Sequence, residues 1–501
     1  MPFTRRNALR TAASLGGWTL AGLFAAPALA QESKTGVVIS ISLEPVSLDP
    51  TASAAASVGE VVHYNILENL VRIDESGALS AQLAYAWSQD AAGKRYTFQL
   101  RKDVVFHDGA PLDAQAVRFS LERGRSAQST NKAKKALFDN IASIETPDPY
   151  TVVLTLHHAD ARTLFRLGES TTVILHPDSA AQAATAPVGT GPYQFVQWKK
   201  GWGITLLKSP RYRHAAQVKL EQATFRFIPD PAMQAAAVQS GEVDVFFNIA
   251  TDNALRFRSD PRYQVLVGMS SGKGMLAINH RRKPLNDVRV RQAITHAIDR
   301  EAFIRDVLRG QGRAIGSHFL PTDPGYVHLT SVYPFDPPRA RALLKAAGVQ
   351  LPLKLSLTLP PTPYARDGGP VIVAALAQVG IEARYELVDW AQWLAGTFKG
   401  QFDLTLINHV EPLDYAIYTD PDYYFGYDSA VFRDLAARHD AALSARERAV
   451  LFAEMQRHLV ADAVNAWIFA PQLSTVARKG LKGVWMNYPI FAHDLAAMSW
   501  E

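Results

Sequence analysis

Two short stretches contain residue types that could bind a metal ion or a phosphate. His157-His158-Ala159-Asp160 offers two imidazoles and a carboxylate, which are common zinc ligands. Adjacent residues of a strand point to opposite faces, so the pair favours a solvated strand edge over a metal site. Residues 268–273 resemble a phosphate-binding loop, but the spacing is one residue short and Gly274 replaces the Ser or Thr that holds magnesium. We therefore expect no metal and no cofactor.

One pattern could indicate a serine nucleophile. Ser270 and Lys273 match the serine-x-x-lysine element of penicillin-recognising enzymes, and Lys34-Thr35-Gly36 and Thr251-Asp252-Asn253 resemble its two companion elements. The three elements occur in the reverse of the required order, and Lys34 lies at the expected start of the mature chain. The chain also has no Gly-x-Ser-x-Gly elbow and no His-Glu-x-x-His motif. The sequence therefore does not predict an enzyme.

The composition excludes several further classes. The chain has no cysteine, which rules out disulfides, thiolate nucleophiles, iron–sulfur clusters and cysteine-bound zinc. The formal net charge is +5, and it falls to about +2 without the three arginines of the N-terminal leader. Proteins that bind nucleic acid usually show a strong basic excess or a basic patch. We therefore expect no nucleic acid partner.

The N-terminus has the features of an export signal. Arg5 and Arg6 precede an apolar stretch over residues 12–26, and Pro27-Ala28-Leu29-Ala30 supplies a small-x-small cleavage pattern. The arginine pair resembles a twin-arginine signal, although Ala8 stands where that signal usually has Phe. We predict that residues 1–30 are a signal peptide. Because no cysteine follows the cleavage site and no other segment could span a membrane, we expect a soluble periplasmic protein without a lipid anchor.

The periodicity of the mature chain predicts a mixture of α and β elements. Residues 351–359 alternate apolar and polar side chains, an apolar helix follows over 370–379, and 381–388 alternate again, which is typical of a β-α-β unit with parallel strands. Asp336-Pro337 predicts a helix start, and Gly348 predicts its end. Ser444 and Glu447 form the pattern of a capping box.

Ordered runs along most of the mature chain resemble one family, the family 5 extracellular solute-binding proteins. These are the dipeptide, oligopeptide and nickel receptors of bacterial ABC importers. Val105-Phe106-His107-Asp108-Gly109 and Val188-Gly189-Thr190-Gly191-Pro192-Tyr193 are two of the runs. The others cover residues 48–50, 83–87, 96–102, 116–121, 240–244, 276–279, 287–294 and 297–300.

The resemblance implies an α/β periplasmic binding protein fold of type II, similar to cluster C, with two lobes and an extra subdomain inserted in the first. Residues 31–52, 184–268 and 470–501 would form lobe I, residues 53–183 the inserted subdomain, and residues 269–469 lobe II. The crossings near 268 and 470 would act as a hinge that closes on a solute. The implied protein is a monomeric receptor that hands its solute to permease subunits without transforming it.

The resemblance also points to a ligand-binding segment in the second lobe. In the family's peptide receptors, a tryptophan-x-x-aspartate segment supplies a carboxylate to the α-ammonium group of the peptide. Here Glu411 falls at the aspartate, Asn408 at the tryptophan, and Asp414 at the start of the following Asp-Pro, with Tyr415 in place of the proline. Together with His409, these residues are the predicted ligand contacts. Residues 420–425 are an alternative counterpart, which would require an insertion before them.

The solute itself stays open between three hypotheses. A short peptide is the leading one. Aromatic side chains in the same region could instead stack on a sugar or on a cationic or planar ligand, which would fit an oligosaccharide, an opine-like conjugate or a metal chelate. These are Tyr415, Tyr418, Tyr423, Tyr424, Phe425 and Tyr427. An exported enzyme on the same scaffold is the third hypothesis.

Overall fold

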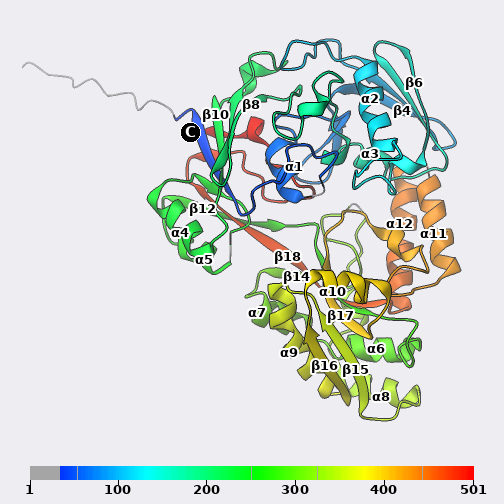
Figure 1. Cartoon of the computed structure of the whole chain (residues 1–501). Helices are drawn as coiled ribbons and strands as arrows, with labels where there is room; N and C mark the ends of the chain where they lie inside the picture. Colours follow the sequence, from blue (N-terminus) through cyan, green and yellow to red (C-terminus); the bar gives the residue numbers. More distant parts are fainter. Residues whose placement is uncertain (1–33, 54, 250, 324, 443) are drawn as a thin grey trace, which may run out of the picture. The chain divides into compact units, whose positions relative to one another are not determined.

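The computed structural model describes residues 34–501, apart from positions 54, 250, 324 and 443. The predicted signal peptide, residues 1–30, lies outside the described residues. The part from Thr35 to Glu501 forms one compact unit of mixed α and β structure. Figure 1 shows its strands flanked by helices, with the chain coloured from blue to red along the sequence.

The largest sheet in the described part of the chain has twelve strands. Ten follow the order β16-β15-β17-β13-β18-β11-β1-β10-β9-β8, while β12 and β14 also pair with β18. The strands are β1 (Gly36–Ile41), β8 (Tyr193–Lys199), β9 (Gly203–Lys208), β10 (Gln222–Phe227), β11 (Val245–Phe246), β12 (Tyr263–Met269), β13 (Lys273–Ile278), β14 (Gly312–Ala314), β15 (Leu353–Leu359), β16 (Ile381–Leu387), β17 (Leu404–His409) and β18 (Asn465–Arg478).

Strand β18 belongs to both halves of this sheet. Its first residues pair with β13 and β14, so that Phe469 lies opposite Ala314. Its last residues pair with β11 and β12, where Val476 lies opposite both Phe246 and Val265. Figure 1 shows this long strand running from one group of strands to the other. One continuous strand therefore connects the two groups of strands.

A second sheet has the order β4-β5-β7-β6 and carries α2 on it. Tyr96, Phe98 and Leu100 of β5 point into its core and are almost fully buried. The elements are β4 (Ala84–Gln89), β5 (Arg95–Leu100), β6 (Ile141–Asp148), β7 (Thr151–Leu156) and α2 (Ala114–Arg125). His157 and His158 lie exposed just past β7, as the solvated strand edge predicts. Two short pairs complete the strands, β2 (Val71–Ile73) with β3 (Leu79–Ala81) and β19 (Leu481–Lys482) with β20 (Ser499–Trp500).

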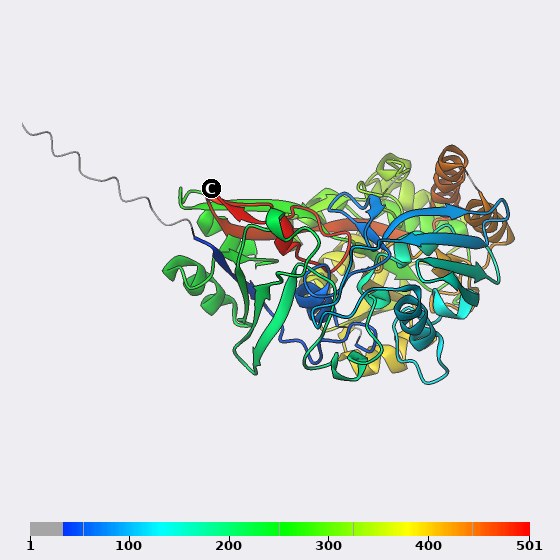
Figure 2. The same cartoon turned by 90° about the horizontal axis from the view of Figure 1, so that it is seen from above.

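The remaining helices pack on the sheets and on one another, and α11 and α12 lie side by side in both Figure 1 and Figure 2. They are α1 (Ala56–Val62), α3 (Thr163–Arg166), α4 (Pro231–Ser240), α5 (Thr251–Phe257), α6 (Val288–His296), α7 (Arg300–Val307), α8 (Pro337–Ala346), α9 (Pro363–Ala377), α10 (Trp390–Ala395), α11 (Ala430–Ala441) and α12 (Ala445–Ala461). The predicted caps are present, since Asp336 accepts a hydrogen bond from the Arg339 N–H (2.9 Å) and Ser444 accepts one from the Glu447 N–H (3.1 Å).

The predicted β-α-β unit is confirmed, because β15 and β16 pair in parallel with Leu353 opposite Ile381. Its helix α9 begins at Pro363, seven positions before the predicted start at 370. Gly368, Gly369 and Pro370 look like a break in the sequence, but the helix runs through them. A Cβ on Gly368 would lie 2.6 Å from Phe303, and one on Gly369 would lie 2.3 Å from Leu359. Close packing of α9 on its neighbours therefore requires glycine at these two positions. The same glycines made this part of the sequence look unlike a helix.

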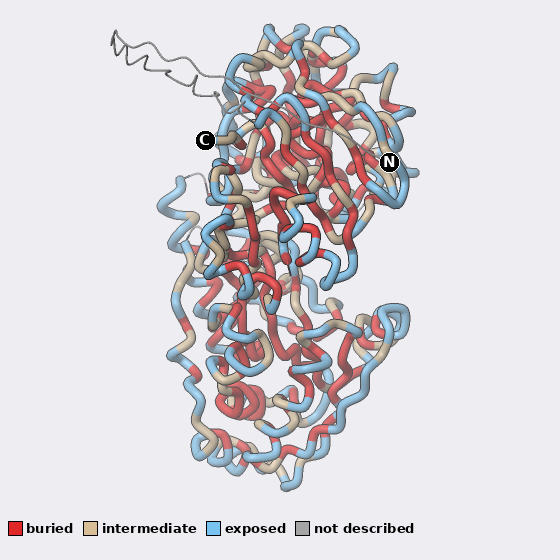
Figure 3. Tube along the Cα trace, turned by 90° about the vertical axis from the view of Figure 1, so that its left-hand side faces the viewer, coloured by how far each residue is buried: buried red, intermediate tan, exposed pale blue. Residues whose placement is uncertain are grey.

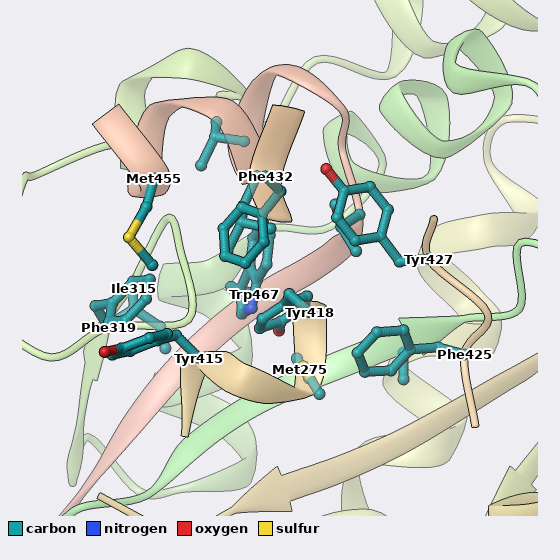
Figure 4. Close-up of a cluster of buried hydrophobic side chains, with 14 of the residues drawn as sticks. Met275, Ile315, Phe319, Tyr415, Tyr418, Phe425, Tyr427, Phe432, Met455 and Trp467 are labelled. Carbon is teal, nitrogen blue, oxygen red and sulfur yellow. The ribbon is translucent and has the colours of Figure 1, made fainter. Parts of the chain in front are cut away.

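The buried apolar side chains form several clusters rather than one core, and Figure 3 shows the buried stretches inside and the exposed ones mainly in outer loops. One cluster covers β1 and β8–β10, another the β4–β7 sheet, and a third the strands β15–β17. A fourth is rich in aromatic residues and lies between α11, α12 and the 3₁₀ turn Tyr415–Tyr418 (Figure 4). This last cluster supports the segment that carries the predicted ligand contacts.

Candidate functional site

The predicted contacts lie at the end of β17 and in the loop that follows it. Asn408 and His409 are the last residues of β17, residues 410–414 form the loop, and Tyr415 begins the 3₁₀ turn Tyr415–Tyr418. Strand β13 runs antiparallel beside β17 and places Lys273 opposite His409. The loop is therefore held between a central strand of the sheet and the aromatic cluster.

The buried side chain of Lys273 holds the 410–414 loop in place. The Lys273 ammonium contacts the backbone carbonyl of Glu411 at 2.5 Å and Oδ1 of Asp414 at 3.0 Å. His318 Nε2 lies 2.8 Å from the same carboxylate oxygen, and His409 Nδ1 lies 3.5 Å from the other one. The side chains of Lys273, His318 and Asp414 are 2%, 0% and 11% exposed. Asp414 thus braces the loop from inside the protein.

The charge state of this network follows from its surroundings. Burial by itself raises the pKa of Asp414, but the interactions with His318 and Lys273 outweigh it and hold that pKa well below its usual range. Burial lowers the pKa of His318 to about 4, so its imidazole is neutral at pH 7. His318, His409 and Asp414 lie close enough to hold a metal ion, with ligand atoms within 4.8 Å of one another. The Lys273 ammonium already balances the carboxylate, so we interpret the group as an ion-pair network.

Lys273 also settles the serine-x-x-lysine pattern. Its ammonium is engaged by Asp414, while Ser270 Oγ donates a hydrogen bond to the carbonyl of Pro471 at 3.0 Å. A lysine paired in this way is not placed to activate the serine, which agrees with the interpretation of the pattern as a chance match.

Glu411 differs from its neighbours because its side chain faces solvent. It is 48% exposed, its Oε1 lies 3.6 Å from the Lys132 ammonium, and its Oε2 accepts a 3.3 Å hydrogen bond from the Val410 N–H. Its backbone carbonyl is fixed by Lys273, whereas its carboxylate is only weakly engaged. This is the arrangement of a positioned carboxylate that is available to a ligand.

Glu411 and Asp414 lie in the wall of a cavity of about 270 Å³. The opposite wall comes from residues far earlier in the chain, among them the ionisable side chains of Lys132, Arg166 and Glu169. Burial raises the pKa of Glu169, against the charges of Arg166 and Lys132. The other lining residues are small, polar or apolar: Ser53, Ala55, Ala56, Ala133, Ala136, Ser170, Thr171, Val410, Pro412, Ala416, Ile417, Ile490 and Phe491. The cavity therefore presents both signs of charge to a solute.

The other three predicted contacts do not line this first cavity in the described part of the chain. The Asn408 N–H donates to Tyr364 Oη at 3.0 Å, and its buried Oδ1 has no hydrogen-bond partner. His409 Nε2 lies 3.1 Å from Tyr424 Oη. Tyr415 is 1% exposed. The structure thus brings Glu411 and Asp414 together at the cavity and places Asn408, His409 and Tyr415 behind it.

Tyr415 lines a second cavity of about 390 Å³. The guanidinium of Arg162 lies over its ring at 4.5 Å, and its hydroxyl hydrogen bonds to Asp440. Arg162 also binds Asp160 at 2.8 Å. Burial raises the pKa of Asp323, another lining residue, to about 6. The guanidinium of Arg162 is therefore already engaged by neighbouring protein groups.

The aromatic residues near the site are mainly core residues. Tyr415, Tyr418, Phe425 and Tyr427 pack with Trp467, Phe432 and Met455 in the cluster of Figure 4. Tyr424 belongs to the same cluster, and Tyr423 is the member of the six that is only partly buried. Packing therefore accounts for most of the aromatic residues that the sequence offered as a stacking surface.

Sequence reasoning missed Lys132, Arg166 and Glu169. These residues occur in no recognisable motif, and they reach Glu411 only through the tertiary fold. Lys273 was noticed, but in the pattern of a serine enzyme rather than as the partner of Asp414.

The first cavity is lined by charged side chains from segments that lie far apart in the sequence, as are many sites that bind small solutes. The sequence matches the family described as bacterial extracellular solute-binding proteins, family 5, over residues 78–430. This chain belongs to that family, whose members are non-enzymatic receptors of ABC importers.

Individual relatives agree with this assignment. The glutathione-binding protein GsiB of Salmonella paratyphi A is 30% identical over 373 residues, which cover 73% of this chain and 71% of the relative. The di/tripeptide-binding protein 1 of Pseudomonas aeruginosa is 26% identical over 434 residues, or 80% of each chain.

Solved structures establish the fold. The periplasmic binding protein DppA of Helicobacter pylori, in complex with the peptide STSA, is 25% identical with a TM-score of 0.77 and covers 94% of this chain and 98% of its own. HbpA2 of Haemophilus parasuis is 22% identical, has a TM-score of 0.86 and covers 93% of this chain and 100% of its own. The predicted α/β periplasmic binding protein fold of cluster C is thereby confirmed. Within the described residues, no helix is long and apolar enough to cross a membrane.

Proposed function

We propose that this receptor captures a short peptide in the first cavity and delivers it to the permease subunits of its importer. The observation that carries the proposal is that the cavity is lined by charges of both signs, the cations Lys132 and Arg166 and the carboxylates Glu169 and Glu411. A short peptide carries an ammonium and a carboxylate at its ends, so it needs a site with both signs of charge. Relatives whose names specify peptides or glutathione support the same class of solute.

We further propose the two-lobed organisation expected from the sequence, with lobe I (31–52, 184–268 and 470–501), an inserted subdomain (53–183) and lobe II (269–469). Its support is that the first cavity is lined by Lys132 and Arg166 on one side and by Glu411 on the other. A cavity built in this way opens when the lobes separate and encloses the solute when they approach.

Within this function, Glu411 is the anchor for the ammonium group of the solute. Its carboxylate is half-exposed and held at a fixed position by the contact of its backbone with Lys273. Asp414 braces the loop, and His409 stands beside it in the same network. Asn408 and Tyr415 support β17 and the following turn from behind.

Titration calorimetry with a panel of di- and tripeptides tests this role of Glu411. Closure would bury the ion pair with the ammonium, so Glu411→Gln should cost about 2–5 kcal/mol, or roughly 30-fold or more in Kd. Its Tm should change little, because the side chain is half-exposed without a solute. Glu382→Gln, an exposed carboxylate on β16, is the matched control and should bind like wild type. Wild-type affinity in Glu411→Gln would remove this residue as the anchor.

The alternative solute is an oligosaccharide, an opine-like conjugate or a metal chelate. A sugar receptor needs aromatic faces that are open to the cavity. Five of the six aromatic residues noted in the sequence are buried in the core instead, which favours the peptide. Stabilisation of the protein by neutral sugars, and by no peptide of the panel, would favour the alternative.

We also propose that the protein is exported to the periplasm through the twin-arginine route and works there as a monomer without a lipid anchor. The support is the Arg5-Arg6 pair, the apolar stretch and the cleavage pattern before Gln31, in a chain without cysteine.

A further inference from the structure

The wall of the first cavity opposite Glu411 contains a short segment with unusual polar groups. Helix α3 ends at Arg166, and the 3₁₀ turn Ser170–Thr172 follows after three residues. Arg166, Glu169, Ser170 and Thr171 all line the cavity. This segment therefore presents several polar side chains to the same space as Glu411.

The guanidinium of Arg166 makes no hydrogen bond and no ion pair with any residue in the described part of the chain. Its Nε atom is buried without a partner. A guanidinium has five N–H donors in a planar fork, and leaving them unpaired away from water is costly. Burial and the charge of Arg162 lower the pKa of Arg166, against the opposing charges of Glu169 and Asp160.

The neighbouring Arg162 makes the ion pair that Arg166 lacks, although its Nη1 atom is also buried without a hydrogen-bond partner. It binds both oxygens of Asp160, at 2.8 and 3.1 Å, and lies over the ring of Tyr415. The Asp160 carboxylate is thus committed to Arg162. Arg166 is left facing the cavity with its donors unused.

Two further groups surround the same space. The Oγ1 atom of Thr171 is buried and also lacks a hydrogen-bond partner. Lys132 adds a second cation at the rim, where it is 43% exposed and lies 3.6 Å from Glu411. Glu169 is the acidic group on this wall, and its side chain makes no hydrogen bond or ion pair with a described residue. An anionic group in the cavity would therefore find an unpaired guanidinium, an unpaired hydroxyl and a partly exposed ammonium within one wall.

We propose that Arg166, assisted by Thr171 and Lys132, is an anion subsite that binds a carboxylate of the solute, so that solutes of this receptor carry at least one carboxylate. The subsite rests on the proposed function in one respect, namely that the solute occupies the first cavity. It deepens that function by adding an acidic group to the recognised features, whatever the rest of the solute is. Glu411 and Arg166 would then bind groups of opposite charge on the same solute molecule.

The test uses pairs of probes that differ only in the acidic group. Thermal shift and calorimetry are run on the mature protein with di- and tripeptides as free acids and as C-terminal amides. Sugar acids are run beside the matching neutral sugars. The variants are Arg166→Gln, Arg166→Lys and, as a control, Arg95→Gln, an exposed arginine of β5 away from the cavity.

The expected result is that every probe that stabilises the wild type carries a carboxylate, and that its amide or neutral analogue binds at least 10-fold more weakly. Arg166→Gln should remove this preference, Arg166→Lys should keep part of it, and Arg95→Gln should behave as wild type. Without a solute, Arg166→Gln should keep or raise the Tm, because it removes an unpaired cation. A clear fall in that Tm would instead indicate a structural arginine.

Equal binding of acid and amide, unchanged preference in Arg166→Gln, or a panel in which no carboxylate-bearing probe stabilises the protein would overturn the proposal. Its failure is distinct from that of the peptide function. If sugar acids bind through Arg166 and peptides do not, the anion subsite stands and the peptide proposal falls. If peptide acids and amides bind equally well, the peptide proposal stands and the subsite falls.

Discussion

Replacing Lys273 with methionine should destabilise this protein far more than the loss of a comparable lysine at its surface. The Lys273 ammonium is 2% exposed and is the full positive charge beside Asp414, because His318 is neutral at pH 7. Methionine would fill the space of the lysine stem but leave the carboxylate buried without its cation. Removal of one partner from a buried ion pair costs about 3–5 kcal/mol.

A matched control is available in Lys208, whose ammonium lies 2.8 Å from Glu221. Glu221 is 58% exposed, and ion pairs of that kind contribute about 0–1 kcal/mol. With an unfolding entropy of about 2 cal/mol/K per residue, a mature chain of about 470 residues loses roughly 1 °C in Tm per kcal/mol. Lys273→Met should therefore lower the Tm by about 3–5 °C, and Lys208→Met by about 1 °C or less.

Thermal unfolding followed by circular dichroism at pH 7 measures both variants. The double variant Lys273→Met/Asp414→Asn should recover a clear part of the lost Tm, since it removes the unpaired charge together with its cation. A Tm loss in Lys273→Met no larger than in Lys208→Met would refute the reasoning. So would a double variant that is less stable than Lys273→Met alone.

Further predictions concern pH, closure and export. Burial lowers the pKa of His280 to about 3, so the stability that it contributes is fully present above pH 6.5 and is lost as the pH falls towards 3. The loss should reach about 2 kcal/mol at pH 5, and the Tm of His280→Gln should fall less than that of wild type between pH 7 and 5; parallel curves would contradict this. Small-angle scattering should show a smaller radius of gyration when a solute identified in the panel is bound, and an unchanged radius at saturation would contradict lobe closure. Changing Arg5 and Arg6 to lysine should leave folded protein in the cytoplasm, and an undiminished periplasmic yield would exclude the twin-arginine route.

The features that the sequence predicted well depend on local rules. The β-α-β unit around α9 follows from side-chain periodicity, and the helix starts at Asp336 and Ser444 follow from capping side chains. The start of α9 was missed because Gly368 and Gly369 serve close packing on Phe303 and Leu359, which no local rule reveals.

Only some of the residues that line the cavity could be predicted from the sequence, for the same reason. Glu411 could be found because it stands in a segment that resembles the family's ligand-binding motif. The partner of Lys273 lies 141 positions away in the sequence, and Arg166 reaches the cavity from a different part of the fold. Contacts of this kind depend on the sheet order, and they could not be read from spacing. The unpaired state of Arg166 is a property of three-dimensional surroundings alone.

The continuity of β18 has a mechanical consequence. Because its hydrogen bonds to β13 and β14 precede those to β11 and β12 along one strand, neither group of strands can slide along the sheet without breaking a ladder. Between Phe469 and Gln472, residues Ala470 and Pro471 pair with β14, so the pairing along β18 continues from one group to the other. The backbone thus resists shear between the two groups of strands and keeps their relative register fixed. In hydrogen exchange, the amides at both ends of β18 should accordingly stay protected whether or not a solute is present.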